Sequence, residues 1–79
     1  MKKIKYIRTK DNAIIVFSEV RQHVEFIDFE PISAGFITFF VNENNDVDCK
    51  CYGNSISLDL KSDEKDTALA QIQLLNYGF

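Results

Sequence analysis

Two segments rich in Ile, Val and aromatic residues open the chain, and a short polar stretch separates them. Residues 2–10 and 13–20 carry this pattern, with Asp11-Asn12 between them. Because Asx residues tolerate positive φ, the pattern predicts a hairpin with a two-residue turn. Both faces of the second strand are apolar, so we expect that strand to lie inside the sheet. The turn sets three pairs opposite each other: Thr9 with Ile14, Ile7 with Val16, and Tyr6 with Phe17.

The middle of the chain holds one weak and one strong strand pattern. Residues 23–30 mix apolar and acidic positions and stop at Pro31, which has no N–H for a sheet and holds the preceding residue extended. A short or edge strand followed by a loop over 31–35 fits this pattern. Residues 35–41, GFITFFV, are apolar on both faces. They predict an internal strand, because such a segment would aggregate as an exposed edge.

In the next two apolar runs, the apolar residues occupy odd positions in one run and even positions in the other. After a four-residue turn at 42–45, the odd positions of 47–52 are apolar, whereas the even positions of 55–60 are apolar. A two-residue turn at Gly53-Asn54, with positive φ at the glycine, would bring both runs onto one face. This turn places three pairs on one surface: Cys51 with Ile56, Cys49 with Leu58, and Val47 with Leu60.

A helix completes the predicted fold. Ser62 or Asp63 can cap its N-terminus, acidic residues fill its first turn, and Gly78 is a stop signal. Helical spacing gives it an apolar stripe of Ala68, Leu69, Ile72 and Leu75. The sequence thus predicts one small α+β domain over 1–79, an antiparallel meander of five to six short strands with one C-terminal helix packed on one sheet face. The pairing order of residues 4–30 stays open.

This register leaves one face of the sheet without a cover. With the four-residue turn at 42–45, the helix stripe covers the cysteine face, because Phe40 pairs with Val47, Thr38 with Cys49 and Phe36 with Cys51. The opposite face then presents four apolar side chains, namely Ile37, Phe39, Val41 and Tyr52. Either the first hairpin or a second copy of the chain covers this face. We favour the second copy, because a symmetric dimer lets one patch complement itself.

Composition narrows the class of protein. The chain has 79 residues, of which 46% are hydrophobic and 27% charged, as in a globular domain. A domain of this size buries little more than about 60% of its unfolded surface, so self-association would help to stabilise it. No apolar run approaches the ~18 residues of a membrane span, and basic residues interrupt the first ten positions where a signal peptide would be apolar. We therefore expect a cytoplasmic protein with reduced thiols and no membrane partner.

Charge is spread unevenly along the chain. Five basic residues and no acid lie in the first ten positions, whereas residues 11–79 carry four basic and twelve acidic residues, for a net charge of −3. The aromatic strand residues are then surrounded by acids, unlike those of single-strand binders, which are flanked by Lys and Arg. We expect no nucleic-acid partner, and we expect the basic segment to be solvated or to lie beside acidic neighbours.

The two cysteines in VDCKCY are the first candidates for chemistry. Positions two apart on a strand have Cα atoms about 6.5–7 Å apart, at or past the limit for a disulfide. Zinc commonly takes four ligands. A catalytic thiolate needs a nearby base and positively charged surroundings. Asp48 and Lys50 lie on the other strand face and supply neither of these to the cysteines. Core packing is favoured over a reactive thiol or a metal site. We expect Cys49 and Cys51 to be buried and reduced, and no metal or cofactor.

Other polar residues give weaker signals. His23, the only imidazole, has no recognisable nucleophile or orienting partner, so a surface or strand-end position is expected. Asp28 and Glu30 would share one strand face, where solvation is a simpler explanation than acid–base chemistry. The sequence contains neither a GxxxxGK[ST] nor a GxGxxG pattern.

These patterns favour a non-enzymatic interaction module that self-associates through the face of Ile37, Phe39, Val41 and Tyr52. The alternative is an acidic inhibitor or decoy that occupies a basic, nucleic-acid-binding surface of a partner, because residues 43–66 carry seven acids against three lysines. An enzyme centred on His23 or a cysteine comes third.

Overall fold

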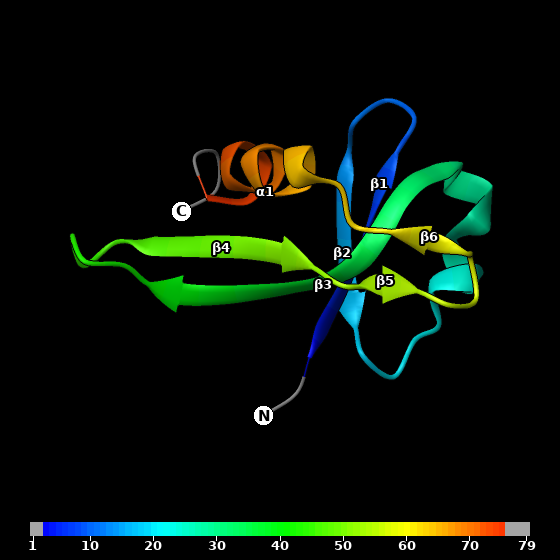
Figure 1. Cartoon of the computed structure of the whole chain (residues 1–79), viewed down its shortest axis with the longest axis horizontal. Helices are drawn as coiled ribbons and strands as arrows, with labels where there is room; N and C mark the ends of the chain where they lie inside the picture. Colours follow the sequence, from blue (N-terminus) through cyan, green and yellow to red (C-terminus); the bar gives the residue numbers. More distant parts are fainter. Residues whose placement is uncertain (1–2, 76–79) are drawn as a thin grey trace.

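A four-stranded antiparallel sheet is the framework of residues 3–75, the part of the chain that this computed structural model describes (Figure 1). Its strands, in the spatial order β2-β1-β3-β4, are β1 (Ile4–Thr9), β2 (Ile14–Ser18), β3 (Pro31–Val41) and β4 (Val47–Tyr52). Two short strands pair separately, β5 (Asn54–Ser55) with β6 (Leu60–Lys61). The helical elements are η1 (His23–Phe29), α1 (Glu64–Ala70) and η2 (Gln71–Leu75). The predicted α+β class, antiparallel sheet and C-terminal helix are confirmed.

The segment between β2 and β3 is helical, so the strand predicted over 23–30 is wrong. η1 is a 3-10 helix, and the Glu25 carboxylate accepts a hydrogen bond from the backbone N of Gln22 at its start (2.6 Å). Three-residue spacing puts His23 and Phe26 on one side of η1, where both rings contact Phe17. The loop predicted over 31–35 is wrong as well. Pro31 opens β3, because the first residue of a strand can dispense with its N–H.

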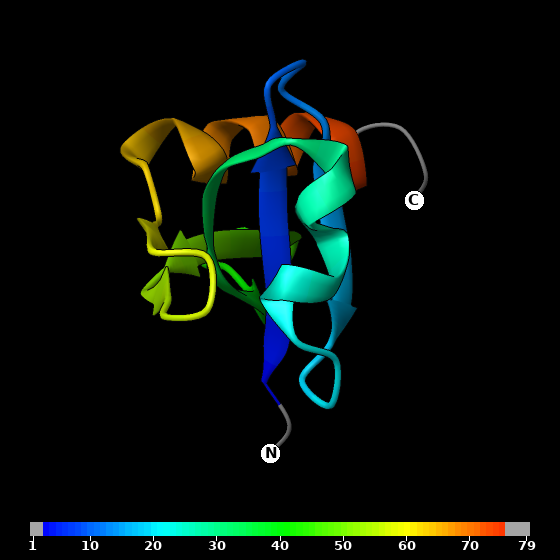
Figure 2. The same cartoon turned by 90° about the vertical axis from the view of Figure 1, so that its right-hand side faces the viewer.

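Strand β2 lies at the edge of the sheet, not inside it as expected. Both of its faces are nonetheless partly covered, although Val16 is 39% exposed. Phe17 packs under η1 on one face, and Ile14 belongs to the core under the C-terminal helix on the other. Figure 2 shows η1 in front of β1, on the side of the sheet that the sequence left uncovered. A strand with two apolar faces can therefore lie at the edge of a sheet when helices pack on both of its faces.

Both hairpin registers differ from the predicted ones by a single residue, and for the same reason. In each loop an asparagine adopts positive φ, Asn12 at 66° and Asn45 at 65°, directly after a tight turn. This is the three-residue loop in which a left-handed residue adds a bulge. As a result Ile7 pairs with Ile15, and Phe39 pairs with Cys49. A shift of one residue in the register turns the side chains of one strand to the opposite face of the sheet relative to those of its partner.

The Gly53-Asn54 hairpin between 47–52 and 55–60 does not form. Gly53 does adopt the predicted positive φ, 80°, but the chain then enters β5, and the tight turn follows later at Asp59. β4 cannot accept a further strand at its free edge, because Thr67 of α1 takes the hydrogen bond of the Cys51 amide (2.9 Å). Ile56 is therefore exposed and does not lie opposite Cys51.

The C-terminal helix begins at Asp63, as predicted, but buries a different stripe. The Asp63 carboxylate caps the backbone N of Lys65 (2.9 Å), and Ala70 is fully buried in the core. Leu69, Leu74 and Leu75 pack against that core, whereas Ala68 and Ile72 face solvent. Leu74 follows the buried Ala70 by four residues, a spacing that places both on the same side of the helix. Gly78 lies outside the described residues.

A buried carboxylate attaches this helix to the sheet. Asp66 is 0% exposed, and its Oδ1 atom accepts hydrogen bonds from Arg8 Nη1 and Ser33 Oγ, both at 2.9 Å. Its Oδ2 atom accepts from the Tyr6 hydroxyl and from the backbone N of Asp63 (3.0 Å). Four donors from β1, β3 and the helix cap therefore meet at one side chain. A buried charge needs such a set of partners to be tolerated.

Replacing this carboxylate should cost a large part of the stability of the domain. We expect Asp66→Asn to lower the free energy of unfolding by about 3–5 kcal/mol, because Arg8 keeps a buried charge without its counter-ion. Urea denaturation followed by circular dichroism measures the loss. Glu64→Gln, an exposed acid in the same helical turn, is the matched control and should change the value by no more than about 0.5 kcal/mol. Equal effects of the two substitutions would contradict the role of the network.

Candidate functional site

The four residues of the predicted self-association face do not share a face. Ile37, which is 2% exposed, pairs with Cys51 and lies in the core beneath the helix, so it is not available to a partner. Phe39 and Val41 are on that same helix side of the sheet, and Tyr52 is on the opposite side beside Phe36. The one-residue register shift at the 42–45 loop causes this division. The face as predicted is therefore wrong, although three of its residues remain exposed.

Two of the exposed members, Phe39 and Val41, lie on an arm that extends from the body of the molecule. The outer ends of β3 and β4 form this arm, at the left of Figure 1. Three apolar side chains gather on its helix side: Phe39, and the directly paired Val41 and Val47, which are 64% and 58% exposed. We call Phe39, Val41 and Val47 the arm patch. β-branched and aromatic residues exposed together on a hairpin are unusual in a soluble monomer.

The arm also has an open backbone edge. Pairing of β3 with β1 ends at Ile37 and Ile4, so along Phe39–Val41 no described residue pairs with β3 on the side away from β4. Along an antiparallel strand, the backbone N–H and C=O groups of successive residues point alternately to the two neighbouring sides. Asn42 N donates to Asp46 O of the β4 side (2.8 Å), so the backbone groups of Phe39 and Val41 point to the free side. The outer edge of β4 is different, because Asp48 Oδ1 and Thr67 Oγ1 bind the amides of Cys49 and Cys51. Among residues 3–75, the arm thus has one open edge and one blocked edge.

The cysteines are core residues, as predicted. Cys49 and Cys51 are both buried and free, and both belong to the central apolar cluster. Burial, with smaller contributions from the neighbouring Cys49 and Asp66, raises the pKa of the Cys51 thiol to about 12. Burial and the nearby Asp48 also raise the pKa of Cys49. Neither group supplies a thiolate at neutral pH, so neither is a good nucleophile.

We expect both thiols to react slowly with a disulfide reagent in the native protein. The reason is their burial and the raised pKa of each group, which together remove access and thiolate. Absorbance after mixing with an aromatic disulfide at neutral pH follows the reaction, and the same protein in urea provides the fully reactive control. Two thiols that react as fast before unfolding as after it would rule out a core position.

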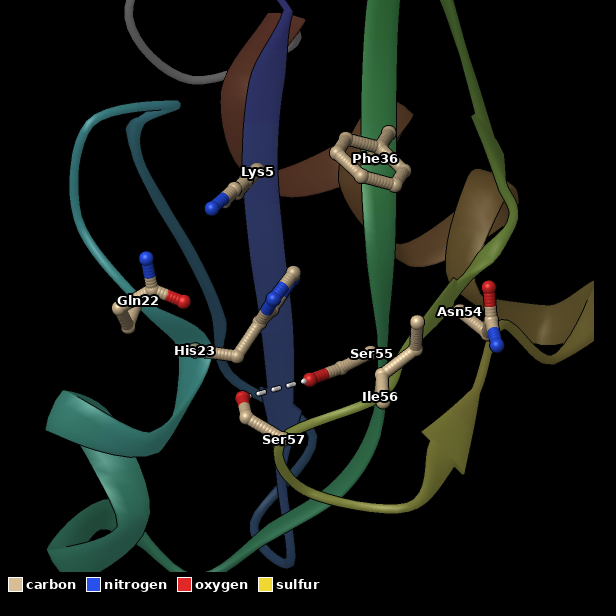
Figure 3. Close-up of a pocket in the computed structure, with 8 residues that line it drawn as sticks. All are labelled: Lys5, Gln22, His23, Phe36, Asn54, Ser55, Ile56 and Ser57. Carbon is tan, nitrogen blue, oxygen red and sulfur yellow. Dashed lines mark hydrogen bonds between the residues drawn. The ribbon is translucent and has the colours of Figure 1, made fainter.

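A cleft with a mainly apolar lining and several polar side chains lies on the side of the sheet opposite the helix. Figure 3 shows its walls, with Lys5 and Phe36 on the sheet, His23 on η1, and Asn54, Ser55 and Ser57 around β5. Its volume is about 380 Å³, and Gln22 and Ile56 complete the lining. The hydroxyls of Ser55 and Ser57 lie 3.3 Å apart. Sequence reasoning missed this cleft, because its walls come from four separated segments.

His23 is the buried centre of this cleft, so its expected surface position is wrong. Its side chain is 5% exposed and packs edge-on against Phe17 and Phe36, with ring centroids 5.4 and 6.0 Å away. Nε2 lies 2.9 Å from the carbonyl oxygen of Gly35 and therefore carries the hydrogen, which leaves the lone pair on Nδ1. Burial lowers the pKa of His23; the Gly35 hydrogen bond opposes this shift, and the positive charge of Lys5 adds to it. The ring is thus a neutral acceptor at neutral pH.

This lowered pKa predicts a stability that depends on pH. Below 6.5 the unfolded chain protonates His23 while the folded protein resists protonation, so the free energy of unfolding should fall as the pH drops below 6.5. Denaturation between about pH 7 and pH 5.5 isolates this effect, because carboxylates titrate mainly at lower pH. His23→Gln, which cannot titrate, should show a flatter profile. The same slope in both proteins, or a His23 pKa above 6.5 by NMR, would contradict this.

The remaining polar residues do not converge on a reactive centre. Asp28 and Glu30 are exposed at the end of η1, not on one strand face, and Glu30 pairs with Lys10. Residues 3–75 contain no group of three or more His, Cys, Asp or Glu side chains arranged to hold a metal ion. In the same part of the chain, no helix combines the length and the apolar character that crossing a membrane requires.

Comparison with known proteins adds no further indication of a site. No protein-family model, curated protein or solved structure matches this chain. The candidate surfaces therefore stand on their geometry, with an apolar arm patch and open edge on one side and a cleft around His23 on the other.

Proposed function

We propose that this protein is a small, non-enzymatic, cytoplasmic interaction module that self-associates through its β3–β4 arm. The observation that carries the proposal is the coincidence of the arm patch with the open edge of β3. Apolar side chains and unpaired backbone groups both favour association, and here both occur at Phe39 and Val41 of β3. A second copy of the chain supplies the complementary surface.

Symmetry defines how two arms would meet. Phe39 and Val41 direct their backbone groups outward, so an antiparallel contact around a two-fold axis at Phe40 sets Phe39 of one copy against Val41 of the other. Each copy then exchanges backbone hydrogen bonds with its partner, and the apolar side chains of both arm patches lie side by side. The pairing extends the sheet of one copy into that of the next.

Two further features support a binding role over a catalytic one. The pKa of both thiols is raised by burial, and the Asp66 carboxylate is already bonded to four donors. The polar groups with unusual environments therefore serve the core. A small domain also gains stability from a shared interface, since its own core is limited.

The acidic-decoy alternative gains nothing specific from the geometry. Of the seven acids in residues 43–66, Asp48, Asp63 and Asp66 make internal hydrogen bonds. The four others are exposed at separate points of the chain: Glu43, Asp46, Asp59 and Glu64. These observations favour arm-mediated self-association over the acidic decoy.

Sedimentation velocity tests the arm. The wild-type protein should sediment as a dimer at tens of micromolar, and Val41→Asp should sediment as a folded monomer, because a charge would be buried between the two arms. Val20→Asp is the matched control, since Val20 is 75% exposed and lies far from the arm in sequence, before η1. Val41→Pro removes the backbone donor of the open edge and should also weaken the dimer.

A monomeric wild-type protein at these concentrations would overturn the proposal. So would a Val41→Asp protein that remains a dimer, because the interface would then lie elsewhere. Circular dichroism of each variant confirms that the comparison is made between folded proteins.

A further inference from the structure

The sheet face opposite α1 combines lysines with aromatic rings. The register puts Lys5 beside Phe36, Phe36 beside Tyr52, and Lys50 on the same face two residues from Tyr52. Phe40 lies further along β3 on this face, and Lys3 Nζ lies 5.1 Å from the centroid of the Phe36 ring. We call this set the lysine-aromatic face; its members are Lys3, Lys5, Phe36, Phe40, Lys50 and Tyr52.

The lysines of this face have no acidic partner in the part of the chain that the structure describes. Arg8 and Lys10 form salt bridges with Asp66 and Glu30, whereas Lys3, Lys5 and Lys50 form none with a described carboxylate. Lys5 Nζ donates only to a backbone carbonyl, that of Arg21 (2.8 Å). Three positive charges on one face of a protein of net charge −3 form a local anion-attracting surface.

Three acids lie near this surface, and one of them is Glu25 of η1, which is close enough to Lys5 for their charges to interact. Asp48 on β4 accepts hydrogen bonds from Gln71 Nε2 (2.6 Å) and from the backbone N of Cys49 (2.7 Å). Glu19 accepts one from the backbone N of Lys3 (3.1 Å). None of the three forms a salt bridge with Lys3, Lys5 or Lys50 among the described residues. The expected acidic neighbours are thus present beside this face, but its lysine side chains are not paired with them.

The aromatic rings are placed to receive flat ligands. Phe36 and Tyr52 lie 5.8 Å apart, with their planes inclined by 30°, and Tyr52 and Phe40 are both more than one third exposed. Rings that stand on adjacent strands of an open sheet face and are flanked by lysines form the usual platform for unpaired bases. Each base stacks on a ring while its phosphate lies beside an ammonium group.

The cleft around His23 continues this face beyond Phe36. Beside the nearly buried His23 ring, it adds amides at Gln22 and Asn54 and hydroxyls at Ser55 and Ser57. These groups both donate and accept hydrogen bonds, as the edge of a base does. At about 380 Å³ the cleft falls within the range of small-molecule sites.

We propose that the lysine-aromatic face binds single-stranded nucleic acid, with phosphates beside Lys3, Lys5 and Lys50 and with bases stacked on Phe36, Phe40 and Tyr52. The cleft around His23 receives the edge of one base. This inference goes beyond self-association and does not depend on it, because the arm patch lies on the other face of the sheet.

Fluorescence anisotropy with labelled oligothymidylate and oligouridylate of about 12 nucleotides tests the proposal on the whole chain. Half-saturation is expected at roughly 1–100 µM protein at physiological salt. Three phosphate contacts predict a slope of about −2 for the logarithm of the association constant against that of salt concentration. Unlabelled duplex of the same length should compete poorly, since its bases are not free to stack.

Matched variants separate charge from stacking. Lys50→Glu should weaken binding at least tenfold, whereas Lys65→Glu, the same charge change on exposed residue 65 of α1, should weaken it much less. Tyr52→Ala should lose roughly 5- to 150-fold, the range seen when a stacking ring is removed. Tyr52→Phe keeps the ring and should bind like the wild type.

Three results would overturn the proposal. The first is no anisotropy change with either oligonucleotide up to about 100 µM protein at low salt. The second is an equal loss in Lys50→Glu and Lys65→Glu, which would show attraction to charge in general and not to this face. The third is duplex that competes as well as single strand. Sedimentation of the same variants is read separately, so a failed dimer and a failed nucleic-acid site are distinguishable.

Discussion

The Asp66 carboxylate is the interaction on which the rest of the structure depends. Without a partner, a charge at 0% exposure is among the most costly groups a small core can contain. Its donors come from β1, β3 and the helix cap, so they are satisfied together only when the helix crosses the sheet in one orientation. That orientation also brings Thr67 to β4 and Gln73 to β2, where their side chains bind the Cys51 and Ile14 amides. The helix therefore covers one face and closes part of both outer edges.

Once the helix covers that face, the two asparagine loops decide which residues of β2 and β4 face the helix. Each loop adds one residue in the left-handed conformation, and this fixes the parity of the strand that follows. With a four-residue loop at 42–45, β4 would turn its cysteine side chains to the other face, whereas β3 would keep Ile37 on the helix side through its pairing with β1. With the observed loops, Phe39, Val41 and Val47 lie together on the arm, and Phe36, Phe40 and Tyr52 join the lysines on the other face. The two proposed surfaces thus follow from the pairing of β3 with β1 and from the bulge at Asn45.

The 3-10 helix η1 and the β5–β6 hairpin give the second face its character. η1 buries Ile7 and Ala34 in the middle of the sheet and brings His23 against Phe36. The close approach of the chain after β4 explains Gly35, because a Cβ atom there would lie 2.3 Å from the carbonyl oxygen of Tyr52. What remains uncovered is the strip along β3 and β4, beside a cleft lined by both additions. An open strip next to a built cleft suits an extended ligand better than a compact one.

The sequence by itself determined the local elements whose signals are local. The strands at 4–9, 35–41 and 47–52, the positive φ of Gly53, the Asp63 cap and the burial of both cysteines could all be predicted, because alternation, capping and turn chemistry act over a few residues. Only the tertiary structure decided the pairing of β3 with β1, the helical state of residues 23–29 and the partners of Asp66. A bulge of one residue costs little locally, yet it reverses which side chains meet across the sheet. Surfaces formed by strands that are distant in the sequence could therefore not be predicted from the sequence pattern.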